Sequence, residues 1–316
     1  MATTDAQVGW ATETTPGTGV TVTDFLPRRS NGTRFTRQTN FIDDDSFNAG
    51  RRMMDRAQRA RAATTYTGTI GTYVYDRGML ELFRAMFGTL VTTGTGPYIH
   101  TFTPGSIADD SLTVQLGNPY SGTGVAPYTY AGAIASAWQL DITAGQTAAL
   151  SADMIASSET TGTALATYSP PSGLVKFQYY NACVKVDTVA YDVRSIRFNA
   201  DNGVSQDKLY LCEQNFDPAE ETDQRAVTGE MVLDFADLTE YNRAVAGDLM
   251  DIQVVMTAGA NTITIDAKAE YDDTNQDAVA QGQTPQQKIP FTVMSTAGGT
   301  DAEALTLTVV NSEATA

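Results

Sequence analysis

Short runs of alternating apolar and polar residues, separated by turn-forming residues, recur along most of this sequence and constrain its fold more than any other feature. Valine, threonine, isoleucine and aromatic residues dominate the runs, whereas glycine, asparagine and proline separate them, which is the pattern of β-strands joined by turns. The predicted strands span residues 111–117, 136–143, 148–157, 175–187, 191–201, 208–214, 228–235, 250–257, 261–271 and 305–311. Strands at this density predict a mainly β fold, an antiparallel β-sandwich or β-barrel.

Two groups of these strands, 111–157 and 175–214, resemble each other in form. Each has an apolar or aromatic entry, a strand, a short turn and an amphipathic return strand. This similarity is consistent with a weak internal duplication of strand pairs, and equally with independent β patterning. At 316 residues the chain is long enough for one elaborated domain or for two small ones.

One segment, residues 76–88, has the periodicity of a helix. Its apolar side chains recur at helical spacing and form one stripe, which consists of Met79, Leu80, Phe83, Met86 and Phe87. Asp76 stands where an N-cap is expected, and Gly88 stands where a helix commonly ends. We expect this helix to flank the sheets and to bury its stripe in the core. A second short helix is expected within 236–250, ending at Gly247.

The polar segment 36–68 is too long for an ordinary connection and has no clean strand period, which predicts a functional arm or a disordered loop. Residues 1–61 contain nine arginines and seven acidic residues, whereas the rest of the chain has 11 basic and 30 acidic residues. A basic arm on an acidic body suits head-to-tail association of identical subunits, and a solvated basic loop is the alternative. The net charge of −17 argues against a protein that grips DNA.

The two cysteines, Cys183 and Cys212, lie in runs with strand-like patterns, so we expect buried, reduced thiols, with a disulfide or a reactive site as the alternative. The sequence shows no disulfide framework, secretory leader or apolar stretch of membrane-spanning length. These features favour synthesis and assembly in a cytoplasm.

Candidate catalytic and metal-binding residues are few. His100 is the single histidine, and its apolar and aromatic neighbours favour a structural role. Asp273, Asn275 and Asp277 have the spacing of the first ligands of a calcium loop, but Thr284 stands where the loop requires an acidic residue. We therefore expect no enzyme activity, no metal and no cofactor.

Taken in order along the chain, several segments resemble the major tail tube protein of long-tailed (siphophage-type) bacteriophages. They are GWATETTPGTGVTVTDFLP at 9–27, GRRMMDRAQRARA at 50–62, TGTIGTYVYDRGMLELFRAMFG at 67–88, SLTVQ at 111–115 and YAGAIASAWQLDITAGQTAALSADM at 130–154. The resemblance covers most of the chain. It implies a single tail tube domain over 1–316, with an inter-ring arm at about 36–68 and a possible C-terminal extension at about 289–316.

The family resemblance also implies a function. In such proteins, which are related in fold to the tube protein of type VI secretion systems, six copies close into a hexameric ring whose inner strands form one continuous β-barrel. The rings stack into a hollow tube around a tape-measure protein, the tube is joined by tail-tip and tail-terminator proteins, and it later conducts DNA without binding it specifically. The implied protein is a structural virion protein, assembled in the host cytoplasm, with no membrane partner.

Candidate residues for these roles follow from the sequence. Bridging to the next ring is expected from Arg51, Arg52, Met53, Met54, Arg56, Arg59 and Arg61. The candidates for an acidic lumen alternate with apolar neighbours on predicted strands, and they are Asp141, Glu230, Asp234 and Asp266. A period of two shows which residues share a face but not which face is inward. The alternative function is a secreted or surface β-sandwich that acts as a binding or adhesion module.

Overall fold

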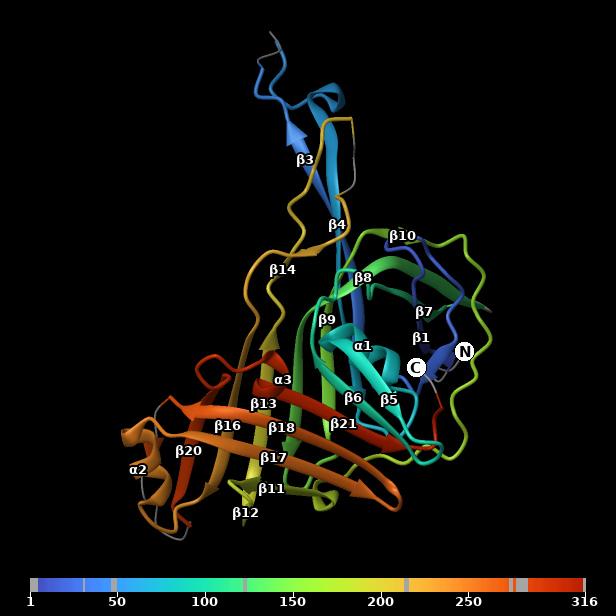
Figure 1. The fold of residues 1–316 in the computed structure, drawn as a ribbon. Helices are drawn as coiled ribbons and strands as arrows, with labels where there is room; N and C mark the ends of the chain where they lie inside the picture. The colour runs from blue at the N-terminus through green and yellow to red at the C-terminus, as the bar shows by residue number, and fades with distance from the viewer. Residues whose placement is uncertain are drawn as a thin grey trace.

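A computed structural model describes residues 5–30, 32–46, 50–121, 124–212, 216–272, 275–276 and 284–314. The fold is mainly β and antiparallel (Figure 1), which confirms the predicted fold class. Within the described residues the strands form open layers, and no closed barrel is present. None of the helices in these ranges is long and apolar enough to span a membrane.

The first layer is a seven-stranded antiparallel sheet that contains strands from both ends of the chain. In spatial order the strands are β3 (Thr33–Asp43), β4 (Arg59–Tyr73), β9 (Ala149–Ala156), β8 (Gly124–Thr143), β13 (Val193–Asp201), β16 (Ala226–Asp234) and β20 (Gln286–Val293). The short strand β19 (Asn275–Gln276) pairs with the other side of β20.

The second layer packs on the inner face of the first. Its strands, again in spatial order, are β12 (Val189–Tyr191), β11 (Ala182–Val186), β17 (Leu249–Ala258), β18 (Asn261–Tyr271), β21 (Leu305–Asn311), β6 (Tyr98–Pro104) and β5 (Gly88–Thr93). The last residues of β18 pair with β20, so the two layers are continuous along one edge.

A smaller sheet contains the opening motif of the sequence. It comprises β1 (Gln7–Thr12), β2 (Asp24–Leu26), β7 (Leu112–Tyr120), the first half of β8 and β10 (Ser158–Thr160). Strand β1 pairs with β7 and β2, so the N-terminal strand docks on its own chain. The long strand β8 leaves this sheet and continues into the first layer, so the two sheets share one continuous strand.

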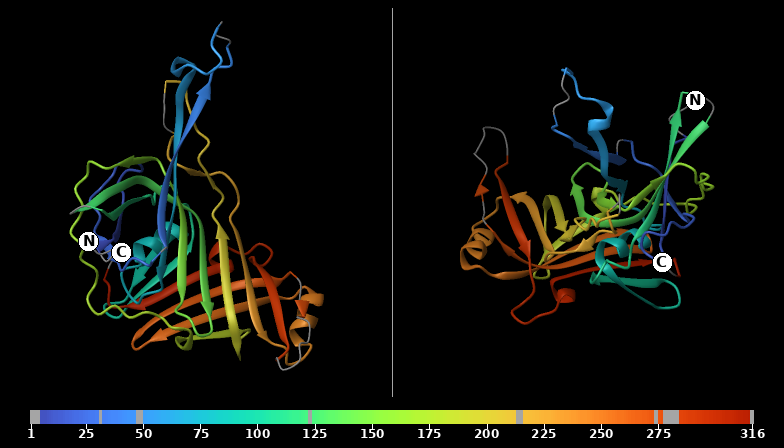
Figure 2. Two further views of the ribbon diagram at one scale, coloured as in Figure 1. Left: turned by 180° about the vertical axis from the view of Figure 1, so that it is seen from behind. Right: turned by 90° about the horizontal axis from the view of Figure 1, so that it is seen from above.

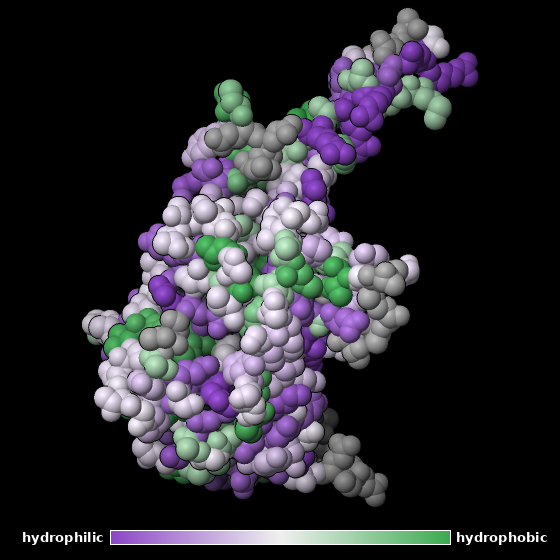
Figure 3. All heavy atoms as spheres, turned by 90° about the vertical axis from the view of Figure 1, so that its right-hand side faces the viewer, coloured by the Kyte–Doolittle hydropathy of each residue, from purple (hydrophilic) through white to green (hydrophobic). Residues whose placement is uncertain are grey.

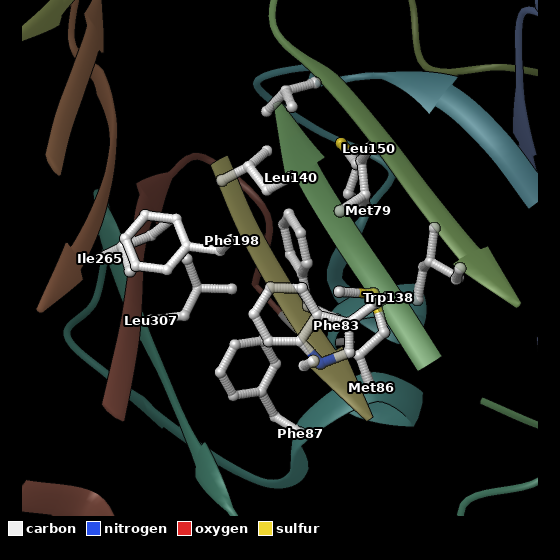
Figure 4. Packing of buried hydrophobic residues seen from close by; sticks show 14 of the residues in the cluster. Met79, Phe83, Met86, Phe87, Trp138, Leu140, Leu150, Phe198, Ile265 and Leu307 are labelled. Atoms are coloured by element: carbon white, nitrogen blue, oxygen red, sulfur yellow. The ribbon is translucent and has the colours of Figure 1, made fainter. Parts of the chain in front are cut away.

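The hydrophobic core lies between the two layers, and helix α1 (Leu80–Phe87) closes one end of it (Figure 4). The Phe87 ring stacks on Trp138 of β8 with a centroid distance of 5.3 Å. Leu140 and Phe198 from the first layer face Ile265 and Leu307 from the second. The predicted apolar stripe is therefore confirmed as a core-packing face, and Gly88 ends the helix with a φ of 95°.

The N-cap prediction at Asp76 is wrong. The helix begins after Met79, which makes no side-chain cap. Asp76 is instead buried and accepts hydrogen bonds from the Val175 backbone N–H at 2.9 Å and from Asn261 Nδ2 at 2.8 Å. A long-range tie between three segments has replaced the local capping role.

The remaining elements are short. They are α2 (Thr239–Ala246), α3 (Asp301–Ala304), the 3₁₀ turns η2 (Arg56–Gln58) and η3 (Tyr179–Asn181), and the pair β14 (Val204–Ser205) and β15 (Glu220–Glu221). Helix α2 ends at Gly247, as predicted, with a φ of 67°. Strands β20 and β21 contribute buried residues such as Phe291 and Leu307, so much of the segment after residue 288 belongs to the core.

Two expectations about the cysteines and their segments are wrong. Residues 208–212 form no strand, and Cys212 has a φ of 76° in an exposed turn. Cys183 lies on β11, but its side chain points outward and is exposed. Both thiols are free, and neither is buried.

Candidate assembly surfaces

The β3–β4 hairpin forms an arm that projects from the layers (Figures 1 and 3). Its base pairs with β9, whereas its distal part pairs with no other strand of the described chain. The tip is structured, because Asp55 and Gln58 form a capping box around η2, with the Asp55 N–H donating to Gln58 Oε1 at 2.8 Å. Segment 36–68 is therefore an ordered hairpin through most of its described length.

The arm tip exposes apolar side chains to an unusual degree. Met53 is 86% exposed, Met54 55% and Ile42 64%. Figure 3 shows the arm as mostly hydrophilic with hydrophobic residues among the polar ones. Exposed methionines on a projecting element are suited to contact with another molecule, because their flexible side chains adapt to an apolar partner surface.

The five candidate arginines of the arm divide into two groups. Arg51 forms an ion pair with Asp55, and Arg59 lies 3.3 Å from Asp43 and over the Phe41 ring at 4.0 Å. The other three are exposed and form no ion pair within the described residues; they are Arg52, Arg56 and Arg61. These three retain uncompensated positive charge.

A second excursion, between β13 and β16, rises at the same end of the molecule as the arm (Figures 1 and 2). It also carries exposed apolar residues: Leu209 is 46% exposed, Tyr210 54% and Leu211 96%. The alternating apolar run at 208–214 predicts a strand, so this exposed surface is not evident from the sequence. An apolar run that is exposed in the folded chain, as this one is, indicates a candidate assembly surface.

Three of the four lumen candidates lie on the outward face of the first layer. Asp141 on β8 accepts from Arg197 Nε of β13 at 3.1 Å. Glu230 on β16 lies 3.6 Å from Lys288 of β20. Asp234 pairs with Arg194, and this hydrogen bond raises the pKa of the Arg194 guanidinium. The face is therefore a ladder of alternating charges across four neighbouring strands.

Asp266 lies on a different surface from the other three. It projects from β18 between the buried residues Ile265 and Ala267, so it faces outward from the second layer. Its carboxylate accepts a hydrogen bond from Gln253 Nε2 at 2.7 Å. If a single layer lines a bore, the four acids cannot all face it.

The opening motif is organised around a buried carboxylate. Glu13 is 3% exposed, and its two oxygens accept from Ser111 Oγ at 2.8 Å, Thr113 Oγ1 at 2.7 Å, Gly17 N at 2.7 Å and Gly132 N at 2.9 Å. Gly17 has a φ of 79°, which explains the glycine four residues after the glutamate. The motif is thus a structural anchor that fastens the N-terminal loop to β7 and β8.

The residues considered for chemistry have structural surroundings. His100 is fully buried, with Nδ1 2.9 Å from Thr92 Oγ1 and Nε2 3.0 Å from the Glu313 carbonyl oxygen, which confirms its structural role. In the described ranges no group of three or more His, Cys, Asp or Glu side chains is placed to hold a metal ion. Asp273 and Asp277 of the calcium-like spacing lie outside those ranges.

The sequence matches the family model described as phage tail tube protein over residues 3–293. A search of curated proteins finds no match. Because the family model spans nearly the whole chain, this chain belongs to the phage tail tube protein family and is a structural component of a phage tail.

Proposed function

We propose that this tail tube protein assembles into hexameric rings, as the family resemblance implies, and that the rings stack into a hollow tube. The β framework that forms one sixth of such a ring is called a tube unit. The observation that carries the proposal is the arm, an ordered hairpin whose apolar and basic tip has no partner strand in the described part of its own chain. A second copy of the chain is the partner that a repetitive tube supplies.

The arm is proposed to reach the neighbouring ring. Arg52, Arg56 and Arg61 supply charge for acidic residues there, and Met53 and Met54 supply apolar area. A single exposed ion pair contributes only about 0–1 kcal/mol, so the contact depends on repetition around the ring and on burial of the methionines. Ring stacking is thus a sum of many weak, identical contacts.

The outward face of the first layer is proposed to line the bore. This layer runs without interruption from β3 to β20, and both the β3–β4 arm and the β13–β16 excursion extend from its strands. Asp141, Glu230 and Asp234 would then face the lumen, each beside a basic residue, and Asp266 would not. Acids interspersed among the arginines and lysine leave no continuous basic track for DNA phosphates, and the net charge of −17 repels them overall.

The proposed tube forms in the host cytoplasm around a tape-measure protein, with tail-tip and tail-terminator proteins at its ends, and conducts DNA during ejection. A tube built by addition of identical subunits needs a nucleus and a length standard that the subunit itself does not encode. These partners therefore belong to the same proposal.

The test is negative-stain electron microscopy of the purified protein with light scattering over a concentration series, with and without a tail-tip nucleus. The double variant Arg52→Glu, Arg56→Glu leaves the Arg51–Asp55 pair and the η2 cap intact, and we expect it to lose tube growth while remaining a folded monomer. Its matched control, Arg52→Lys with Arg56→Lys, preserves charge and should still form tubes. Tubes of normal length from the glutamate variant would contradict the arm assignment, and persistent monomers of the unaltered protein with the nucleus present would contradict the conduit itself.

A further inference from the structure

The first layer contains the same three-stranded arrangement twice. Strands β3, β4 and β9 pair in the order and direction of β13, β16 and β20. The registers agree row by row, and the rows at the centre are Phe35–Gly68–Met154 in the first repeat and Phe198–Gly229–Phe291 in the second. In both, an arginine precedes the phenylalanine and a threonine precedes the glycine. Matching order and register together indicate two copies of one structural unit.

The elements that follow each pair of strands also correspond. After β4 comes α1 and then the antiparallel pair β5–β6; after β16 comes α2 and then β17–β18. Both helices have eight residues and end at a glycine with positive φ. Their sequences, ELFRAMFG at 81–88 and EYNRAVAG at 240–247, share glutamate, arginine, alanine and glycine at the same spacing. This repeat therefore divides the chain differently from the two strand groups, 111–157 and 175–214, whose sequences resemble each other.

The two repeats are joined edge to edge inside the chain. Strand β8 pairs with β9 of the first repeat on one side and with β13, the opening strand of the second repeat, on the other. Gln139 lies opposite Asn199 and Leu140 opposite Phe198 in this junction. The Asp141–Arg197 ion pair crosses it at the next row.

At each end of the two joined repeats lies a strand that could form the same junction with another copy of the chain. Strand β3 corresponds to β13, and in the described chain it pairs with β4 alone, which leaves its other edge free. Strand β19 corresponds to β8, because Asn275 lies opposite Lys288 of β20 as Gln139 lies opposite Ser151 of β9. An open edge at one end and the matching strand at the other make the sheet self-complementary.

We propose that each chain carries two tube units, and that copies join head to tail by pairing β19 of one copy with the free edge of β3 of the next. The register of β8 with β13 then places Asn275 opposite Thr36 and Gln276 opposite Phe35, and Arg34 takes the position of Arg197. This assignment rests on the proposed ring of six tube units. With two units in each chain, three chains close the ring instead of six.

The surface of α2 supports a second copy as the occupant of this junction. Leu238, Tyr241 and Val245 form one face of α2 and are 54%, 41% and 72% exposed. Their counterparts on α1 are at most 1% exposed, and they are Met79, Leu82 and Met86. At its C-terminal end α1 also meets the second repeat, because Asn202 Nδ2 donates to the Met86 carbonyl at 3.1 Å and Arg225 Nη1 to the Phe87 carbonyl at 2.9 Å. The next chain supplies α2 with the corresponding cover.

The decisive experiment is a cryo-electron microscopy reconstruction of the assembled tubes without imposed symmetry. We expect three chains per ring, with the β3–β4 arm alternating with the β13–β16 excursion around the circumference. Six chains per ring would overturn this inference and leave the proposed tube in place. Protein that never assembles, even with a tail-tip nucleus, would overturn the tube and the inference together.

A variant tests the junction itself. Arg34 is exposed and forms no ion pair within the described residues, so Arg34→Glu should leave the monomer's thermal unfolding unchanged. At the proposed junction it should reduce the yield of tubes at least tenfold. Lys176→Glu makes the same charge change on an exposed residue outside both repeats. Because Lys176 Nζ lies over the Tyr73 and Tyr75 rings at 4.8 Å and 5.8 Å, its thermal unfolding is measured as well, and it should assemble normally. Equal tube yields from the two variants would refute the assignment of β3 to the chain-to-chain contact.

Discussion

Replacing Glu13 tests whether the opening motif anchors the fold. Its carboxylate accepts four hydrogen bonds, two from backbone N–H groups and two from hydroxyls, and is only 3% exposed. The hydroxyls of Ser111 and Thr113 can rotate toward other acceptors. The N–H groups of Gly17 and Gly132 cannot, because the backbone fixes their direction.

The magnitude follows from this count of donors. A buried donor left without its acceptor costs about 1–3 kcal/mol, and the Gly132 N–H is fully buried whereas that of Gly17 is partly so. Glu13→Ala removes both acceptors and should lower the free energy of unfolding by about 2–5 kcal/mol. In Glu13→Gln, one oxygen remains, so one backbone N–H loses its acceptor and the loss should be about 1–3 kcal/mol.

The assay is urea unfolding followed by tryptophan fluorescence, since Trp10 lies on the adjacent strand β1 and Trp138 lies in the core. Asp5→Ala, an exposed acid in the same terminal segment, is the control and should change little. The expected order of stability is unaltered protein, then the glutamine variant, then the alanine variant. Values for both Glu13 variants within about 0.5 kcal/mol of the unaltered protein would refute the anchoring role.

Two further outcomes are expected. Both thiols should react with a maleimide in the folded monomer without denaturant, since Cys183 and Cys212 are exposed; a native protein with fewer than two reactive thiols would contradict that exposure. Burial raises the pKa of Glu313 above its ordinary value of 4.5, so the folded state binds its proton more tightly than the unfolded state does. The stability from this group is present below pH 4.5 and is lost as the pH rises through the folded-state pKa. The stability of the Glu313→Gln variant relative to the unaltered protein should therefore increase between about pH 4 and pH 7. A difference in urea midpoint between the two proteins that stays constant over this pH range would contradict this.

Local patterns predicted the fold wherever burial and pattern coincide. The predicted strands at 261–271 and 305–311 have the bounds of β18 and β21, because apolar residues alternate there with one face buried. The same alternation at 208–214 failed, since Leu209 and Leu211 are exposed in a projecting segment. Periodicity reports which side chains share a face, but an apolar face held for another molecule has the same pattern as one buried in the core.

Long-range contacts account for what could not be predicted at the candidate surfaces. Asp76 satisfied the rule for a helix cap, yet segments 99 and 185 residues away along the chain use its carboxylate. The acids of the first layer were found by their alternation, but their pairing with Arg194, Arg197 and Lys288 depends on the order of strands in the sheet. That order is a property of topology, which no single strand encodes.

The internal repeat shows why strand order matters more than local similarity for this chain. The helices share four residues in eight, and the central rows share only the Phe–Gly pair, so sequence similarity alone is too sparse to distinguish duplication from ordinary β patterning. Register is a stronger criterion, because a slip of one residue would turn every side chain to the opposite face. Two three-stranded groups that agree in strand order, direction and register, and whose second strands are followed by helices ending at equivalent glycines, would require several independent coincidences. A chain that already joins two such units through β8 and β13 therefore contains, within itself, the geometry by which it should join the next chain.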